Sequence, residues 1–502
     1  MTESLEAQVE VLRADVNTSR SSRSLNGEQY HMIITDTPEP TIPRSISTSH
    51  SPTNTDAAVK DLASLPRSYF FTLVEAWFRE DHCWLPILDQ AHIQDCLSQL
   101  SSEVFHISDL VLRAIIALKI HYSSQAISLG YKGRRRLSLY LRSQVLAEAM
   151  SSPSLDSIRA LFIIALYDFG SDNIPSTLNI MSMCRRTGAH IGIFRQLLKR
   201  IEAQSPQQVG PPSLQIMTAD NYHVAVTWGI LSWDATSSLG VSWRDVTADL
   251  TDHLAGIAYL TTPDFRDSFV THNHLAAIGL QPVHEFNYAC GKGEHQHLEG
   301  DTMAAVEDIY WNLSMYVHGM PISGYTLMEA GAVDFDINHI FTRLLAHAAI
   351  IMTYQRYITD DNTQNTQLAR DRCFEAYNQL IDLIRNMSDI DTECNSPAFG
   401  HFIAHAVRYR LVLEYSSGIA REPAFDVLMH GLSMCARRWP VARRLDIVFR
   451  VAVVEIDTGV TDLPRTFWNL KKSLHDISEE LKNWFEVRKP SLGVAMLNAP
   501  YA

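Results

Sequence analysis

Residues 152–170 have the sequence SPSLDSIRALFIIALYDFG. They show apolar residues at helical spacing, a pattern that recurs along most of the chain. Pro153 and Ser154 precede a run of apolar residues at helical spacing, and serine is a good residue for capping the N-terminus of a helix. The stretch therefore predicts a helix over residues 154–171.

Helical periodicity continues on both sides of this stretch, and runs that alternate β-branched and polar residues are few. The predicted helices cover residues 67–80, 89–99, 107–128, 133–150, 154–171, 175–191, 219–239, 302–319, 336–358, 366–388, 397–416, 423–437, 440–457 and 464–487. Residues 200–218 and 255–300 are predicted to be rich in loops. We expect an all-α fold, a large irregular body of about a dozen or more packed helices arranged as helical hairpins. This body spans residues 61–490, and residues 491–502 form a tail.

The N-terminal region has a different composition. An apolar seam is formed by Leu5, Val9, Leu12 and Val16. These residues predict a short coiled-coil-like helix over residues 1–16, which is either a weak dimer seam or a frayed helix without a partner. Residues 17–60 are rich in Ser, Thr, Pro and Asn and predict a disordered linker.

Composition narrows the class of protein. Of the 502 residues, 46% are hydrophobic and 20% are charged, which is typical of a folded protein. The net charge of −14 repels polyanions, so DNA contact has to come from elsewhere. The seven cysteines are scattered along the chain, which predicts reduced thiols, mostly in helices. Without a long apolar run or a signal pattern, we expect the cytosol or nucleus and no membrane partner.

One segment, VHEFNYACGKGEHQH, contains residue types that bind metals. They are His284, Cys290, Glu294, His295 and His297. Imidazole, thiolate and carboxylate groups can all bind zinc, but this spacing matches no familiar site. We therefore favour a polar surface loop over a metal site, and we expect no metal or cofactor in this chain.

Motifs for catalysis are missing. No G-x-S-x-G sequence is present, and Gly291, Lys292 and Gly293 lack the ending of a phosphate-binding loop. We therefore predict no enzymatic activity. Asp234 lies on an apolar helix, and a buried carboxylate needs a partner, so we favour a structural salt bridge or a capping bond over contact with a ligand.

Two groups of basic residues stand out. The first consists of Lys132, Arg134, Arg135, Arg136 and Arg142, and the second of Arg437, Arg438, Arg443 and Arg444. The first group is interpreted as a solvated helix start, with a localisation signal or an anion-binding patch as the alternatives. The second group is predicted to decorate two helix ends.

Four segments in order resemble the middle homology region of fungal binuclear-zinc-cluster transcription factors. The first, YFFTLVEAWFREDHCWLPILD, has Trp84, Pro86 and Ile87 where that family has an aromatic-x-Pro-Ile turn. The second is the opening stretch, with its proline-serine start and its end from tyrosine to glycine.

The third and fourth segments follow the same order. MCRRTGAHIGIFR is similar to a helix of the family that ends in Leu-Gly-Leu-His-Arg, with Arg186, Gly192 and Arg195 in register and Phe194 in place of histidine. VTWGILSWDATSSLG resembles the helix that bears Trp, Asp and Ser, here Trp228, Asp234 and Ser238. Weaker similarities to the same family occur further along the chain, and one of them is ARRWPVARR around Trp439 and Pro440.

The resemblance implies a nuclear, helical regulator of fungal metabolic or secondary-metabolite genes. Expected partners are a second copy or a partner transcription factor, the transcription machinery and a small-molecule effector. The six cysteines of the family's zinc cluster are absent, and residues 1–16 look like the coiled-coil linker that normally follows that cluster. Zinc is thus expected only if a cluster precedes this chain. Either the sequence is truncated, or the protein regulates through partners that contact DNA.

A different class of function remains as an alternative. The chain would then be a small-molecule-binding or scaffold protein that kept the helical domain and has no role in transcription. Occupancy of chromatin through a partner discriminates between the two.

Overall fold

The computed structural model describes residues 52–99, 109–122, 129–203, 219–239, 268–291, 301–320, 336–359 and 363–488. Within these ranges the protein is built of helices and contains no strand, which confirms the all-α prediction. The predicted helix over residues 1–16, its seam Leu5, Val9, Leu12 and Val16, and the tail lie outside the described residues.

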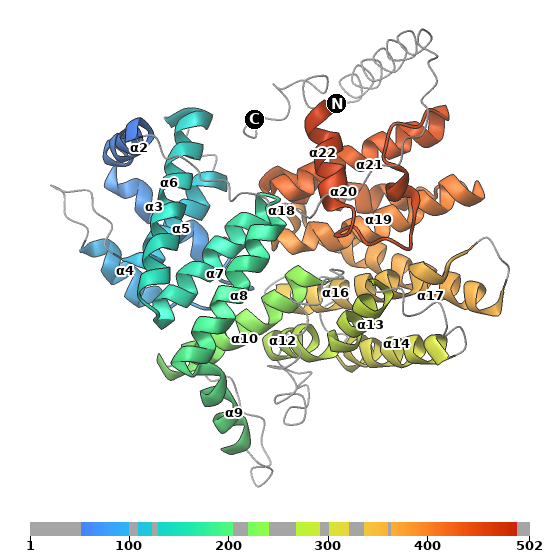
Figure 1. Cartoon of the computed structure of the whole chain (residues 1–502), viewed down its shortest axis with the longest axis horizontal. Coiled ribbons are helices and arrows are strands. Elements are labelled where there is room, and N and C mark those ends of the chain that lie inside the picture. Colours follow the sequence, from blue (N-terminus) through green and yellow to red (C-terminus); the bar gives the residue numbers. More distant parts are fainter. Residues whose placement is uncertain are drawn as a thin grey trace, which may run out of the picture.

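The first half of the described chain forms one group of packed helices (Figure 1). It contains α2 (Pro52–Ser64), α3 (Arg67–Glu80), α4 (Gln90–Ser98), α5 (Leu110–Tyr122), α6 (Gly130–Ser151), α7 (Leu155–Gly170), α8 (Ile174–Ile191), α9 (Ile193–Ala203) and α10 (Ala219–Ser238). Helices that follow each other in the chain often pack together, as α5 with α6 and α7 with α8.

The second half continues from α10 and returns to α7. It contains α12 (Ser268–His274), the π-helical turn η2 (Leu275–Gly279), α13 (Gln281–Gly291), α14 (Asp301–Gly319), α16 (Ile337–Tyr354), η4 (Gln355–Tyr357), α17 (Gln364–Arg385), α18 (Asp389–Glu393), α19 (Pro397–Ser417), α20 (Phe425–Arg438), α21 (Pro440–Thr458), η5 (Arg465–Trp468) and α22 (Ser478–Arg488). Sequential pairs recur here as α16 with α17 and α20 with α21.

Three long helices form the centre of the core, and two of them, α7 and α19, join the two halves. Helices α7, α16 and α19 are buried along most of their length. The sequences of α7 and α16 are largely apolar, whereas α19 also buries polar side chains such as His405 and Arg408. Helix α19 packs against α7 as well as against α16, α20 and α21, and α21 also touches α7. The core therefore runs without interruption from the first half into the second.

The start of the described chain corrects the end of the linker prediction, because residues 52–60 belong to α2, while residues 17–51 lie outside the described residues. This helix packs on α6 and buries Ala58 and Leu62, and Leu65 just after its end is also buried. Its Asp61 accepts hydrogen bonds from Arg136, 2.9 Å from Nε to Oδ2. The helix is thus held by tertiary contacts that a polar composition does not reveal.

Two segments that were predicted as loops are partly helical. Residues 268–291 form α12, η2 and α13, and residues 193–203 form α9. The α12 sequence, SFVTHNH, looks polar, but its last four residues, Thr271 to His274, are buried. Nδ1 of His274 lies 2.7 Å from the Tyr316 hydroxyl. Polar groups that find partners inside the protein can occupy a core, and this is why the prediction was wrong there.

The predicted helix over residues 464–487 is also wrong in part. A short turn, η5, is followed by irregular backbone as far as Ile477, and only then does α22 begin. The cause is Arg408 of α19, which is fully buried. Its guanidinium donates hydrogen bonds to the carbonyl oxygens of Thr466, Phe467, Asn469 and Lys472, over 2.6 to 3.2 Å.

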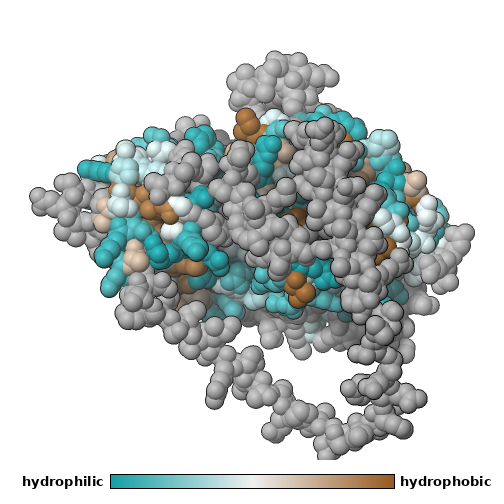
Figure 2. Space-filling model, turned by 90° about the horizontal axis from the view of Figure 1, so that it is seen from above, coloured by the Kyte–Doolittle hydropathy of each residue, from teal (hydrophilic) through white to brown (hydrophobic). Residues whose placement is uncertain are grey.

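The surface is mainly hydrophilic on the face drawn in Figure 2, where hydrophobic residues of the described chain form small separate groups. Among the described helices, none is both long and apolar enough to cross a membrane. None of the seven cysteines forms a disulfide, and five of them lie in helices, which confirms the prediction of free thiols.

Candidate functional site

The four family-like segments meet in the first half of the protein. Helix α10 packs on α7 and α8, and the turn after α3 packs on α10. Trp233 of α10 is the common contact, with its ring centroid 6.2 Å from that of Trp84 and 6.3 Å from that of Phe162. Gly229 permits this approach, since a Cβ atom there would lie 3.0 Å from the Phe162 ring.

The third and fourth segments are joined by a buried ion pair. Asp234 of α10 is fully buried and pairs with Arg185 of α8, which is 3% exposed. This confirms the expectation that Asp234 has a structural partner. Removing one partner of a buried ion pair typically lowers the stability of a protein by several kcal/mol, because the other charge stays buried and unpaired. The pair therefore fixes the register of α8 against α10.

The other predicted family residues have structural or exposed positions. Ser238 is buried and donates a hydrogen bond to the Asp234 carbonyl oxygen at 2.6 Å. Gly192 ends α8 with φ of +80°, as a C-cap does. Trp84 is buried and donates from Nε1 to the Glu80 carbonyl oxygen at 3.1 Å. Pro86 and Trp228 are half-buried, and Arg186 and Arg195 are exposed.

A second polar group connects the two halves of the protein. Arg438, the last residue of α20, lies 2.6 Å from Oδ1 of Asp81, the buried residue that ends α3. Asp81 also pairs with Lys119 of α5, whose Nζ lies 3.0 Å from Oε2 of Glu80. Lys119 and Arg438 help to lower the pKa of Glu80 to about 2, against the opposing effect of burial. Two cations and two carboxylates thus balance inside the core.

Next to this group, Trp439 fits into the end of α7. It is fully buried, and its Nε1 donates to the Asn395 carbonyl oxygen at 2.8 Å. A Cβ atom on Gly170 would lie only 2.4 Å from the Trp439 ring. Gly170 belongs to the second family-like segment and Trp439 to the weaker similarity ARRWPVARR. This contact therefore joins an early family-like segment to a late one.

The basic groups are less exposed than predicted. Arg438 and Arg444 are buried, and Arg444 lies 2.7 Å from a carboxylate oxygen of Asp172. Arg142 donates two hydrogen bonds to Asp168, at 2.7 and 2.5 Å. Of the run that begins α6, Lys132 and Arg135 are exposed, whereas Arg134 is buried. The second group does lie at two helix ends, the end of α20 and the start of α21, as predicted, although Arg438 and Arg444 are buried there. The interpretation of the first group as a solvated helix start is wrong for Arg134.

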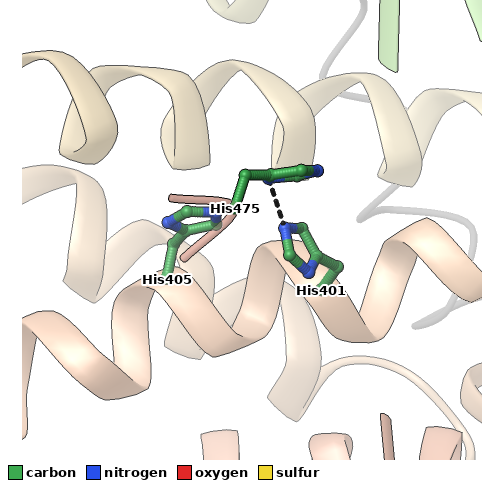
Figure 3. A group of neighbouring side chains, drawn as sticks. All are labelled: His401, His405 and His475. Carbon is green, nitrogen blue, oxygen red and sulfur yellow. Dashed lines mark hydrogen bonds between the residues drawn. The ribbon is translucent and has the colours of Figure 1, made fainter. Parts of the chain in front are cut away.

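A group of histidines lies where the two halves meet. His401 and His405 of α19 and His475 of the irregular segment before α22 converge on one point (Figure 3). Nε2 of His401 is 3.1 Å from Nδ1 of His475, and Nε2 of His475 is 3.2 Å from the carbonyl oxygen of Ser237 in α10. Burial lowers the pKa of His475 to about 4, so its imidazole is neutral at pH 7.

This histidine group was not among the predicted metal candidates. Within the described chain, the groups whose ligand atoms lie close enough to hold one metal ion are His401, His405 and His475, and His92, Cys96 and Asp109. The spacing of four between His401 and His405 was visible in the sequence and is typical of helical metal ligands. His475 is 70 positions beyond His405 and carries no local signal.

The weaker metal candidates do not form a site in the described chain. His284 and Cys290 both lie on α13, where His284 is buried and Cys290 is half-buried, and they are not grouped with each other as metal ligands. Burial lowers the pKa of His284 to about 4, and the charge of a protonated His475 would lower it further. His295 and His297 lie outside the described residues.

Comparison with known proteins gives no assignment. No family model matches the chain, and no curated protein is significantly similar to it in sequence. The resemblance to fungal regulators therefore depends on the residues quoted above.

Proposed function

We propose that this chain is the helical regulatory body of a transcription regulator that acts in the nucleus on fungal metabolic or biosynthetic genes. DNA contact would come from a partner protein or from a module outside this sequence. The proposal starts from the four segments that resemble the middle homology region of fungal zinc-cluster factors.

One observation supports this proposal most directly. Trp233 of the fourth segment contacts Trp84 of the first and Phe162 of the second, and the Arg185–Asp234 ion pair joins the third segment to the fourth. Consecutive helices such as α7 and α8 pack together in any case, so the contact between Trp84 and Trp233, which are far apart in the sequence, carries most of this support. A shared core is what we expect if the resemblance reflects one domain of common descent.

The charge of the chain supports action through other proteins. A net charge of −14 disfavours direct approach to DNA, so contact with the promoter is assigned to a partner. The mechanism we infer is recruitment: the rigid helical body holds a binding surface for the transcription machinery while a partner holds the promoter.

A tethering experiment tests this function. The full chain is fused to a bacterial repressor's DNA-binding module in a fungal host, with the matching operator upstream of a reporter gene. We expect reporter transcription to change at least severalfold relative to the DNA-binding module alone. A change in either direction, activation or repression, would support the proposal.

Two control fusions make the result specific. Asp234→Ala breaks the buried ion pair, weakens the packing of α8 on α10 and should reduce the effect. Trp311→Ala changes an exposed side chain of α14 outside the shared core, and the fold should tolerate it. No reporter change with a fusion that is abundant, folded and bound at the operator would contradict the proposal and favour the scaffold alternative.

A further inference from the structure

We propose that His401, His405 and His475 bind one transition-metal ion of the zinc type, in a buried site between α10, α19 and the segment before α22. The inference is independent of the proposed role in transcription. It depends on spacing, distances, a supporting hydrogen bond and unpartnered nitrogen atoms, considered in that order.

Spacing places two ligands on one face of a helix. His401 and His405 are separated by about one turn of α19, and both side chains point toward His475 in Figure 3. Two histidines four positions apart on a helix are a recurrent zinc-binding arrangement, because one ion can reach both rings.

Distances place the third ligand within reach of the same ion. One nitrogen atom from each of the three rings lies within 4.8 Å of the others. The closest pair, Nε2 of His401 and Nδ1 of His475, is separated by 3.1 Å. Nitrogen ligands about 2.0–2.1 Å from a tetrahedral zinc ion lie roughly 3.4 Å apart, so modest side-chain adjustment would complete the site.

A hydrogen bond orients the third histidine as metal sites require. Nε2 of His475 donates to the carbonyl oxygen of Ser237 at 3.2 Å. This bond puts the proton of neutral His475 on Nε2 and leaves the lone pair of Nδ1 facing His401. Histidine ligands of metals usually donate their second nitrogen to a carbonyl or carboxylate group, which fixes the ring and its tautomer.

Unpartnered nitrogen atoms point to a missing ligand. His405 is 1% exposed, and within the described chain neither of its ring nitrogens has a hydrogen-bond partner. A buried polar group without a partner is costly, and such groups are rare unless a ligand or a water satisfies them. A metal ion between the three rings would satisfy His405.

The charges around the site are compatible with a bound cation. Arg408 and Arg444 are the nearby cations, and His284 faces His475. Asp476 supplies negative charge, and Arg408 is already engaged with four carbonyl oxygens.

The competing group is on the surface. His92 is exposed, and its Nε2 lies 3.8 Å from the Cys96 thiol. If a cobalt ion bound to the group of His92, Cys96 and Asp109, the Cys96 thiolate would produce a charge-transfer absorption band. A site of three histidines cannot produce this band. Cobalt(II) therefore distinguishes the two groups in the unmodified protein.

The test is a titration of the chelator-treated full chain with Co²⁺, followed by visible absorption, and with Zn²⁺, followed by calorimetry. We expect one ion per chain, the absorption bands of tetrahedral or five-coordinate cobalt, and no thiolate charge-transfer band. His405→Gln should weaken binding by about tenfold or more. The control His347→Gln changes a buried histidine of α16 outside the site and should bind the metal normally.

Three results would overturn the proposal. They are the absence of saturable binding, a thiolate charge-transfer band that Cys96→Ser removes, and unchanged affinity in His405→Gln. If circular dichroism shows that His405→Gln does not fold, the metal stoichiometry and the cobalt spectrum of the unmodified protein still decide whether the three histidines bind the ion. An increase in the thermal midpoint on adding Zn²⁺ is a further expected result, since a ligand of the folded state stabilises it.

Discussion

At the scale of single residues, Asp234 illustrates how a buried charge constrains a helical core. It has no solvent contact, and its pairing with Arg185 makes α8 and α10 dependent on each other. The sequence predicted that Asp234 needs a partner, because an unpaired carboxylate in an apolar helix is too costly. It could not identify Arg185, since α8 and α10 are joined by a long connection and their register depends on the whole core.

The first prediction concerns this ion pair. Asp234→Ala leaves Arg185 buried without its counter-charge and should lower the free energy of unfolding by about 3–5 kcal/mol. The double variant Arg185→Met with Asp234→Leu removes both charges and should recover most of this loss. Urea denaturation followed by circular dichroism measures both. A double variant no more stable than Asp234→Ala would show that the pair has a role beyond balancing charge.

The second prediction concerns Gly170. An alanine there would place its Cβ 2.4 Å from the Trp439 ring, so the end of α7 and Trp439 must move apart. Overpacking of this kind typically costs about 1–3 kcal/mol. Gly133→Ala in α6 is the matched control, because the nearest atom to its Cβ would be 3.2 Å away. Equal thermal midpoints for the two variants would contradict the tight contact.

At the scale of elements, Arg408 shapes the segment that carries His475. Its guanidinium binds four carbonyl oxygens of residues 466–472, and it has no carboxylate in direct contact within the described chain. Burial lowers the pKa of Arg408 to about 9, so it remains protonated at neutral pH. These carbonyl groups would accept helical hydrogen bonds if α22 extended back to residue 464.

The third prediction follows from this arrangement. Arg408→Met fills similar space but cannot bind the carbonyl groups, so residues 465–477 should lose their order and His475 its position. We expect faster amide hydrogen exchange in this segment and metal affinity reduced by about tenfold or more. Arg450→Met, in a half-exposed pair on α21, is the control. Unchanged exchange and affinity in Arg408→Met would exclude this positioning role.

Elements could be predicted wherever apolar residues recur at helical spacing, as in α7, α16 and α19. The predictions failed where tertiary polar contacts replace that pattern. The α12 helix buries His272, Asn273 and His274, and its sequence therefore looks like a loop. Residues 464–477 have helical periodicity, but a distant arginine competes for their carbonyl groups. The histidine site was missed for the same reason, since His475 joins α19 only through the fold.

At the scale of the whole molecule, the many buried histidines predict sensitivity to acid. Burial lowers the pKa of His121, His272, His284 and His475 to about 4 and that of His347 to about 3. Between these values and about 6.5, the unfolded chain binds protons that the folded protein does not. The stability that these histidines contribute is complete above about pH 6.5 and decreases as the pH falls toward 4.

Two carboxyl groups act in the opposite direction. Burial raises the pKa of Glu455 to about 7 and that of Asp172 to about 6, so their folded forms keep protons that the unfolded chain releases. Because the depressed histidines outnumber them, we expect the urea midpoint of the metal-free protein to be lower at pH 5.5 than at pH 7.5. Each histidine contributes up to about 1.4 kcal/mol per pH unit in this window. A midpoint that is equal or higher at pH 5.5 would contradict this balance.

The central claim, a regulatory role in transcription, is tested most directly by chromatin immunoprecipitation of the full, untethered chain expressed with an epitope tag from its own promoter. We predict enrichment at discrete promoters of metabolic genes, lost in Asp234→Ala and kept in Trp311→Ala. The chain should also concentrate in the nucleus. Cytoplasmic protein without enrichment at any promoter would contradict the claim and favour a scaffold or small-molecule-binding protein.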